Sequence, residues 1–220
     1  LLIRAFVASE DQNFFEHIGI DFRGIARATV SNLQAIGTGR RPEGASTITQ
    51  QVAKNFLLTN EVSLERKAKE AILAIRIERA FSKDQILELY LNEIYLGRRS
   101  YGVAAAALNY FDKSLDELTL SEMAYLAALP KAPNNYHPVR NKEAAIARRN
   151  YVLSRMLEDG YINQAQADAA RDADLVAVTG RADDYVEAGH FTEEVRRRLF
   201  ERFGEKQLYD GGLSVRTTLE

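Results

Sequence analysis

Residues 10–19 hold the first side chains that could perform acid–base chemistry. Two adjacent acids, Glu10 and Asp11, are followed by aromatic residues beginning at Phe14 and then by His17. An acid beside aromatic surface is poorly hydrated, which raises its pKa and suits it to general-base work near neutral pH. The spacing alone favours a simpler alternative, in which a solvated helix end places its aromatic residues in the core.

A second segment gathers hydroxyl and amide side chains at a predicted helix start. It contains Ser46, Thr47, Gln50, Gln51 and Lys54. Free backbone N–H groups at a helix N-terminus favour an anion, and Gln51 and Lys54, three residues apart, share one helical face. Ordinary capping by Ser46 or Thr47 explains one hydroxyl but leaves the paired glutamines unexplained.

A third segment places two cations near a carboxylate. Arg66 lies four residues before Glu70 and Lys67 lies three before it, so a helix would bring both cations beside the acid. Such a cationic clamp suits a diphosphate. The alternative is a solvated helix face joined by salt bridges, which is common.

Apolar residues recur at helical spacing directly after the first segment. The stripe contains Phe22, Ile25, Ala26, Val30, Leu33 and Ile36. Its periodicity favours a helix that faces the core, while an interfacial membrane helix is the alternative. Residues 37–44 hold three glycines and a proline, which predicts a mobile loop.

The composition limits the class of protein. The chain has 220 residues, 46% of them hydrophobic, and a formal net charge of -2, which allows one core domain with an appendage. This charge gives no overall attraction to nucleic acid, so no nucleic-acid partner is expected. No cysteine is present, which excludes disulfides and thiolate metal sites, and three scattered histidines do not suggest zinc.

Local signals predict a mainly helical chain. Capping-box patterns open predicted helices at Thr47, Ser82 and Thr119, and the second of these should continue to Gly97. Another helix is predicted from Lys142 to Glu158. No apolar run has the roughly eighteen residues of a membrane-spanning helix, and both chain ends look like cuts through a longer protein.

The three polar segments and two later ones form five ordered motifs. They are Glu10-Asp11-x-x-Phe14-x-x-His17-x-Gly19, Gly44-x-Ser46-Thr47-Ile48-Thr49-Gln50-Gln51, Arg66-Lys67-x-x-Glu70, Lys83-x-x-Ile86-Leu87-Glu88-x-Tyr90-Leu91-Asn92 and Arg148-Arg149-x-x-Val152-Leu153. Together they resemble the glycosyltransferase family 51 domain of class A penicillin-binding proteins. Ala45 stands where many members have a second glycine, and Val62 where some carry a basic residue.

The resemblance implies a mainly α, lysozyme-like domain over residues 1–178, without its N-terminal anchor. Residues 179–220 would form a linker with some β structure, including a predicted strand at 213–217, and the start of a truncated transpeptidase region. The Ser-x-x-Lys motif does not occur in a plausible context, so this fragment should polymerise glycan without cross-linking peptides. The implied location is the periplasmic face of the bacterial inner membrane.

Members of this family use lipid II as acceptor and a growing lipid-linked glycan chain as donor. The inverting displacement forms β-1,4 links and releases undecaprenyl pyrophosphate. The resemblance makes Glu10 the general base and adds Glu70 to the catalytic set. The implied substrate-binding residues are Asp11, Phe14, Ser46, Thr47, Gln50, Gln51, Lys54, Arg66 and Lys67. Of these, Lys54, Arg66 and Lys67 would clamp the departing diphosphate.

Two roles stay open for Glu70. It could order the clamp cations, or it could hold a divalent ion, Mg or Mn, against the diphosphate. No organic cofactor is expected. The fourth and fifth motifs are expected to be structural, with Asn92 and Arg148 joining helices. Their expected core residues are Leu87, Leu91, Val152 and Leu153.

The resemblance also implies contact with a membrane surface, since a polyprenyl-linked substrate leaves the bilayer only at a high cost in free energy. The apolar stripe and the glycine-rich loop would form a flap that touches lipid. The arginines expected near the headgroups are Arg23, Arg27, Arg40 and Arg41.

Two other functions compete with this interpretation. A lysozyme-like hydrolase or lytic transglycosylase would also be helical and use an acid beside aromatic residues. The basic segment argues against it, because cleavage of a neutral glycosidic bond needs no diphosphate clamp. The other alternative is a non-catalytic helical scaffold.

Overall fold

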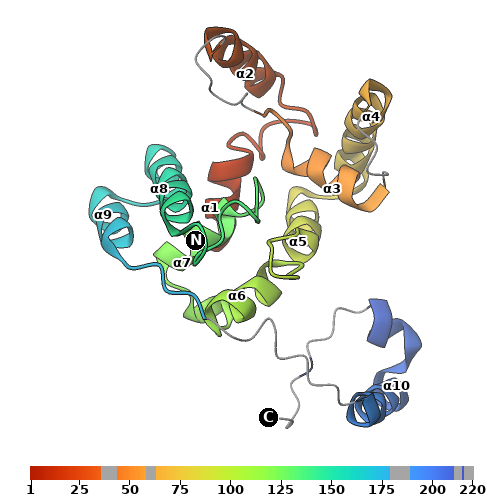
Figure 1. Cartoon of the computed structure of the whole chain (residues 1–220). Helices are drawn as coiled ribbons and strands as arrows, with labels where there is room; N and C mark the ends of the chain where they lie inside the picture. Colours follow the sequence, from red (N-terminus) through yellow and green to blue (C-terminus); the bar gives the residue numbers. More distant parts are fainter. Residues whose placement is uncertain (36–43, 58–62, 179–188, 211–214, 216–220) are drawn as a thin grey trace. The chain divides into compact units, whose positions relative to one another are not determined.

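A computed structural model describes residues 1–35, 44–57, 63–178, 189–210 and 215 (Figure 1). Contacts between Cα atoms divide the chain into two compact units, Leu1–Thr179 and Gly180–Glu220. The described residues are mainly helical, and an isolated bridge between Tyr95 and Tyr101 is their only β pairing. The mainly α class is therefore confirmed. The predicted strand at 213–217 lies, apart from residue 215, outside the described residues, as does the predicted loop at 37–44 apart from Gly44.

The first unit contains, in chain order, α1 (Leu2–Glu10), α2 (Phe22–Ala35), α3 (Ile48–Leu57), α4 (Leu64–Ala80), α5 (Lys83–Glu93), α6 (Val103–Phe111), the 3-10 helix η1 (Leu115–Glu117), α7 (Leu120–Ala128), α8 (Lys142–Glu158) and α9 (Gln164–Asp172). The second unit contains α10 (Gly189–Asp210). Over the described part of the chain, none of these helices combines the length and apolar character that a membrane crossing requires.

Local hydrogen bonds explain where the helices begin. Oγ of Ser82 accepts a bond of 3.3 Å from the backbone N–H of Gln85, whose side chain accepts one of 2.9 Å from the N–H of Ser82. The same reciprocal arrangement opens α7 at Thr119 and α3 at Thr47. Each bond satisfies a donor that the first helical turn leaves unpaired, and the three predicted capping boxes are confirmed.

The predicted helix ends are right in one case and wrong in another. Helix α8 spans Lys142–Glu158, as its pattern predicts. Helix α5 ends at Glu93 instead of continuing to Gly97, because Ile94 adopts an extended conformation with φ -61° and ψ 128°. The chain turns at Gly97, whose φ of +84° lies in the left-handed region.

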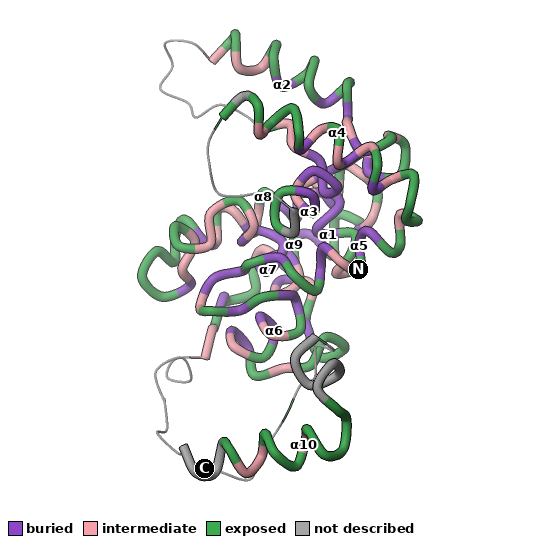
Figure 2. Tube along the Cα trace, turned by 90° about the vertical axis from the view of Figure 1, so that its right-hand side faces the viewer, coloured by how far each residue is buried: buried purple, intermediate pink, exposed green. Residues whose placement is uncertain are grey.

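Helix α1 lies in the core of the first unit and packs against α7 and α8, while α3 packs against α4 and α5 (Figure 2). Phe6 and Val7 of α1 are buried. The core residues expected from the fourth and fifth motifs are also buried, namely Leu87, Leu91, Val152 and Leu153. The core therefore fixes α1 from several sides, and with it the acid at the C-terminal end of that helix.

Helix α2 turns its apolar stripe to solvent. Phe22, Ile25, Val30 and Leu33 are 67%, 40%, 56% and 63% exposed, whereas Gly24 and Ala28 are the buried residues of this helix. The expectation that the stripe faces the core is therefore wrong. Sequence periodicity cannot distinguish the core from another apolar environment, since both select the same spacing.

A buried arginine joins three helices of the first unit. Arg149 of α8 is 1% exposed. Its guanidinium donates to Oγ of Ser121 on α7 at 3.0 Å, to the carbonyl of Arg171 on α9 at 2.7 Å, and to that of Ala173 at 2.6 Å. The fourth and fifth motifs predicted that Asn92 and Arg148 join helices. That assignment is wrong for Asn92, whose side chain is exposed, and Arg149 performs this role on α8.

Replacement of Arg149 by Met should destabilise the domain. The buried hydroxyl of Ser121 and the partly buried carbonyls of Arg171 and Ala173 would lose a donor, and an unsatisfied buried group costs about 1–3 kcal/mol. The free energy of unfolding should fall by about 3 kcal/mol and the thermal midpoint by roughly 6–12 °C. Lys142→Met, at an exposed position of the same helix, is the control and should change the stability by less than about 0.5 kcal/mol. Equal midpoints for the two variants would contradict the network.

Candidate active site

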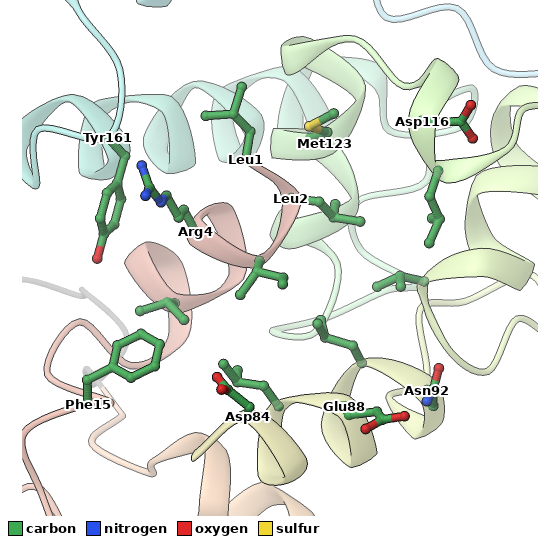
Figure 3. A pocket seen from close by; sticks show the side chains of 16 residues that line it. Leu1, Leu2, Arg4, Phe15, Asp84, Glu88, Asn92, Asp116, Met123 and Tyr161 are labelled. Atoms are coloured by element: carbon green, nitrogen blue, oxygen red, sulfur yellow. The ribbon is translucent and has the colours of Figure 1, made fainter. Parts of the chain in front are cut away.

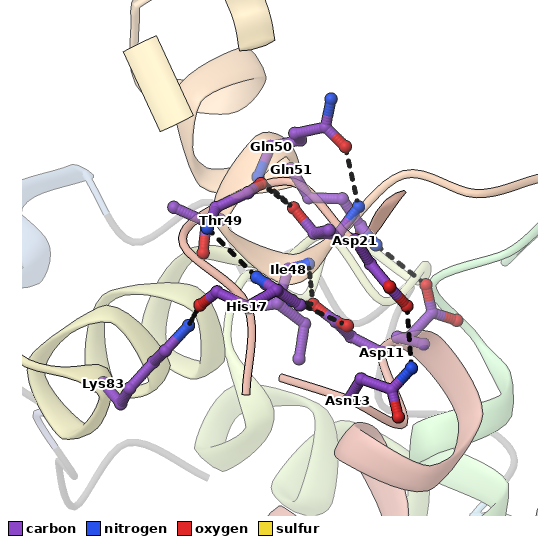
Figure 4. A network of polar contacts seen from close by, with 12 residues as sticks. Asp11, Asn13, His17, Asp21, Ile48, Thr49, Gln50, Gln51 and Lys83 are labelled. Carbon is purple, nitrogen blue, oxygen red and sulfur yellow. Dashed lines mark hydrogen bonds and ion pairs between the residues drawn. The ribbon is translucent and has the colours of Figure 1, made fainter. Parts of the chain in front are cut away.

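The buried carboxylate of Asp11 connects the end of α1 to the start of α3. It is 6% exposed. Its oxygens lie 2.9 and 3.0 Å from Nε2 of His17, and Oδ2 accepts a bond of 2.9 Å from the backbone N–H of Ile48 (Figure 4). Because Nδ1 of His17 accepts from the N–H of Gly19 at 3.0 Å, Nε2 carries the proton and donates to Asp11.

Further polar contacts attach this segment to its neighbours. Oγ1 of Thr47 donates to the carbonyl of Gly19 at 2.7 Å, and Nζ of Lys83 donates to the carbonyl of His17 at 2.7 Å. Gly19 has φ +98°, and a Cβ there would lie 2.8 Å from the carbonyl of Ala74 on α4. Only glycine therefore allows the first motif to approach α4 so closely.

Glu10, at the C-terminal end of α1, is held by hydrogen bonds from the neighbouring helix. Nε2 of Gln51 donates to Oε2 of Glu10 at 2.9 Å, while Oε1 of Gln51 accepts from the hydroxyl of Tyr90 at 3.4 Å. Burial raises the pKa of Glu10 above its usual range, and the bond from Gln51 and the charges of Arg148 and Lys131 only partly offset this effect. A carboxyl group with a raised pKa is a candidate for acid–base chemistry.

Glu10 opens onto a polar cavity of about 330 Å³. Its other polar lining residues are Ser9, Asp11, Gln12, Arg27, Ser46, Gln51, Lys131, Arg148, Tyr151 and Arg155. Gln12 accepts from Arg155 at 2.6 Å and from Arg27 at 3.2 Å. The cavity therefore joins one carboxylic acid of raised pKa to a wall of cations, an arrangement suited to an anionic substrate.

Arg148 of α8 lines this cavity and pairs with Glu10 of α1. Its Nη2 lies 3.9 Å from Oε1 of Glu10, its guanidinium lies 4.4 Å from the ring centre of Tyr151, and its side chain is 10% exposed. Its buried Nε has no hydrogen-bond partner. This ion pair joins α8 to α1, as expected for Arg148, and it also places the guanidinium beside the acid of the cavity. Arg149 points about 100° away from it on the same helix and contacts α7 and α9 instead.

The third motif forms a separate cationic cluster on α4. Glu70 is 2% exposed. One of its oxygens pairs with Nη1 of Arg66 at 3.5 Å and the other with Nζ of Lys67, which also donates to Oγ of Ser46 at 2.8 Å. Ser46 lines the cavity of Glu10, so this serine connects the two groups of cations. Lys54 is exposed on α3, the helix that packs against α4.

Besides Lys54, Arg66 and Lys67, the structure places the predicted substrate-binding residues in two groups. Asp11, Ser46 and Gln51 line the cavity. Phe14, Thr47 and Gln50 are buried and make internal contacts. The ring of Phe14 contacts Phe15, His17 and Lys83. Sequence reasoning missed Gln12, Arg27, Lys131, Arg148 and Arg155 because they come from segments that only the fold brings together.

A divalent metal does not fit the residues around Glu70. Both oxygens of its carboxylate face cations, whereas Mg²⁺ prefers several oxygen ligands. In the part of the chain that the structure describes, no three His, Cys, Asp or Glu side chains are grouped so that they could hold a metal ion.

Comparison with known proteins identifies the class. The family model described as Transglycosylase matches residues 1–157. The chain belongs to this family, and it is a peptidoglycan glycosyltransferase domain.

The chain is similar to one part of several longer proteins. It is 52% identical over 220 residues to penicillin-binding protein 1A of Rickettsia felis, covering 100% of this chain and 28% of that protein. It is 49% identical over 218 residues to penicillin-binding protein 1A of Escherichia coli, covering 99% and 25%. The 2.6 Å crystal structure of penicillin-binding protein 1A from Haemophilus influenzae matches with a TM-score of 0.45 and 43% identity, covering 75% of this chain and 21% of that one. The chain thus spans about a quarter of the length of these relatives.

The raised pKa of Glu10 predicts how Glu10→Gln changes stability with pH. Ionisation of this buried carboxyl group opposes folding, so its cost is absent below the unfolded pKa of about 4.3 and complete above the folded pKa. The variant should therefore gain stability relative to the wild type as the pH rises from about 4 to 8. Denaturant unfolding at several pH values measures this difference. A difference that stays constant or shrinks over this range would show that Glu10 carries no such cost.

Proposed function

We propose that the domain polymerises lipid II into β-1,4-linked glycan by inverting displacement of undecaprenyl pyrophosphate. The observation that carries this proposal is Glu10, a largely buried acid whose pKa is raised and which opens onto a cavity walled by cations. Family membership supports glycosyl transfer as the reaction class. The cations of α4 and α8 are the reason for proposing a lipid-linked diphosphate as the substrate.

Glu10 acts as the base in this mechanism. The 4-hydroxyl of the acceptor sugar attacks the anomeric carbon of the donor, a C–O bond forms, and the bond to the diphosphate breaks. Glu10 takes the hydroxyl proton, and the diphosphate leaves with the electron pair of the broken bond. Gln51 orients the carboxylate through its bond to Oε2, and a base of raised pKa accepts the proton more readily near neutral pH.

Two groups of cations match the two lipid-linked substrates. Arg66 and Lys67 on α4, with the exposed Lys54, stabilise the departing diphosphate of the donor. Arg148 and Arg155 on α8 line the cavity of Glu10 and bind the diphosphate of the acceptor. Guanidinium groups suit this task because they bind phosphate oxygens in a bidentate manner.

Glu70 orders the donor clamp in this scheme. Its buried carboxylate receives Arg66 and Lys67 on its two oxygens and so fixes their positions before substrate arrives. The catalytic role first assigned to Glu70 is then a positioning role.

A glycan hydrolase is the competing function, because it would also use one buried acid. Cleavage of a neutral glycosidic bond gives no role to the cations of α4 and α8. Product sizes after incubation with lipid II separate the two, since growth of polymer supports synthesis.

Glu10→Gln should lower polymerisation of labelled lipid II by about a hundred- to ten-thousand-fold, the range that an aligned general base contributes. The variant should fold normally. Glu16→Gln, an exposed acid in the same motif, is the matched control and should retain full turnover. Substantial turnover by Glu10→Gln would remove Glu10 from the role of base.

Chelation separates the two roles of Glu70. If Glu70 orders cations, excess EDTA should leave wild-type turnover unchanged, whereas Glu70→Gln should lower it by about tenfold or more at unchanged substrate concentration. Strong inhibition by EDTA, reversed by added Mg²⁺ or Mn²⁺, would instead assign Glu70 or the diphosphate to a metal site.

The exposed stripe of α2 is proposed to contact the membrane that holds the lipid substrate, on the periplasmic face of the bacterial inner membrane. Four large apolar side chains of this helix are exposed, and each buried CH₂ group contributes about 0.8 kcal/mol to membrane binding. Arg23 is exposed beside the stripe and suits anionic headgroups. Arg27 instead lines the cavity and donates to Gln12. Residues 179–220 are proposed to lead toward a transpeptidase region.

Replacement of Val30 and Leu33 by Ser should weaken binding to anionic lipid vesicles without changing the thermal midpoint, since both side chains are exposed. Leu108→Ser with Val139→Ser removes two similarly exposed side chains elsewhere and should leave vesicle binding intact. Vesicle flotation measures binding. Equal flotation of the two double variants would show that α2 is not the membrane contact.

A further inference from the structure

A second, apolar cavity of about 1030 Å³ lies between α1, α5 and α7 (Figure 3). It shares no lining residue with the cavity of Glu10, and the proposed reaction does not use it. We call it the α1–α5 groove. Its apolar lining residues are Leu1, Leu2, Ile3, Val7, Phe15, Leu87, Leu91, Val103, Leu115 and Met123.

The rim of the groove is apolar and open to solvent. Phe15 and Leu115 are 57% and 36% exposed, while Val7 and Leu91 form buried parts of the wall. Contiguous exposed apolar surface that is bordered by polar residues marks an interaction site. The volume lies at the upper end of the roughly 300–1000 Å³ of small-molecule sites, so an extended apolar occupant fits better than a compact one.

The polar border of the groove is mainly acidic. Asp84 and Glu88 of α5 are exposed on one side, and Asp116 of η1 is exposed on the other (Figure 3). No ion pair joins these three carboxylates to any residue that the structure describes. The cation of the lining is Arg4, whose guanidinium lies 5.4 Å from the ring centre of Tyr161. The border therefore favours an occupant with positive charge.

The four-residue spacing of acidic and apolar side chains along α5 favours a helix as the occupant. Asp84 and Glu88 lie four residues apart, as do Leu87 and Leu91, so α5 presents an acidic row beside an apolar row. An amphipathic helix lying along α5 presents matching rows, with apolar anchors at i, i+4 and i+7 and basic residues beside them. We propose that the α1–α5 groove docks such a helix, apolar on one face and lined by Lys or Arg, from a partner protein.

The groove borders α1 and α5, the two helices that also position Glu10 and its partner Gln51. Helix α1 contributes Val7 to the groove and ends at Glu10, and α5 contributes Leu87 and Leu91 while its Tyr90 contacts Gln51. A partner that shifts α1 or α5 thus changes the position of Glu10. Binding itself does not depend on the proposed reaction, so it is tested without substrate.

The test uses three labelled peptides of about four helical turns and fluorescence anisotropy with the whole chain. The first peptide has leucine at i, i+4 and i+7 with flanking lysines. The second replaces the lysines by glutamate, and the third replaces the leucines by serine. The first should bind at least tenfold more tightly than the other two, since the groove combines apolar and acidic surface.

Protein variants assign the binding to the groove. Asp84→Lys with Glu88→Lys should weaken binding of the lysine peptide at least tenfold and reverse the preference toward the glutamate peptide. Glu143→Lys is the matched control, because it reverses an exposed acid in the first turn of α8, as Asp84→Lys does in α5. Thermal midpoints verify that each variant is folded.

Four results would overturn the proposal. The lysine and glutamate peptides could bind equally well, or the control could lose as much binding as the double variant. Competition of the peptide by neutral lipid vesicles would assign the groove to lipid. Concentration-dependent dimerisation that excludes the peptide would assign it to a second copy of this chain.

Discussion

The arrangement of the first unit around its site depends on one buried charge, the carboxylate of Asp11. An ionised group is costly to bury unless hydrogen bonds replace its water, and here the ring of His17 and the N–H of Ile48 do so. Because Ile48 is the first residue of α3, the positive end of that helix also favours the carboxylate. Asp11 thereby fixes the start of α3 against the end of α1. Glu10, which precedes it, meets Gln51 on the next turn of α3.

The hydrogen-bond partners of Glu10 differ from those of the adjacent Asp11. Asp11 receives donors from two directions, whereas Glu10 receives one amide and stands 3.9 Å from the nearest guanidinium nitrogen of Arg148. Burial therefore outweighs the favourable contacts and raises the pKa of Glu10. Adjacent acids in one motif thus have different surroundings, with Asp11 bonded to His17 and Ile48 and Glu10 bonded to Gln51.

Local chemistry made some features predictable from sequence. The capping boxes at Thr47, Ser82 and Thr119 depend on residues three apart, and α8 follows from its own pattern. The cavity could not be predicted in full because Arg27 of α2 and Arg155 of α8 are far from Gln12 in sequence and meet it only in the folded chain. The sequence also did not predict which side chains are buried. Phe14, Thr47 and Gln50 were expected to bind substrate, yet they are buried and make internal contacts. The apolar stripe of α2 was expected in the core, yet it faces solvent.

Helices α1 and α5 each contribute residues to the apolar groove and to the surroundings of Glu10. Helix α1 has 9 residues and α5 has 11, so each is short enough to move as a rigid unit. Side chains on one face of α1 pack into the core with α7 and α8, and its C-terminal end carries Glu10. A closely packed interior transmits displacement instead of absorbing it. Any contact that shifts α1 or α5 therefore changes the distance from Glu10 to Gln51, and the 2.9 Å bond between them is the most direct measure of that coupling.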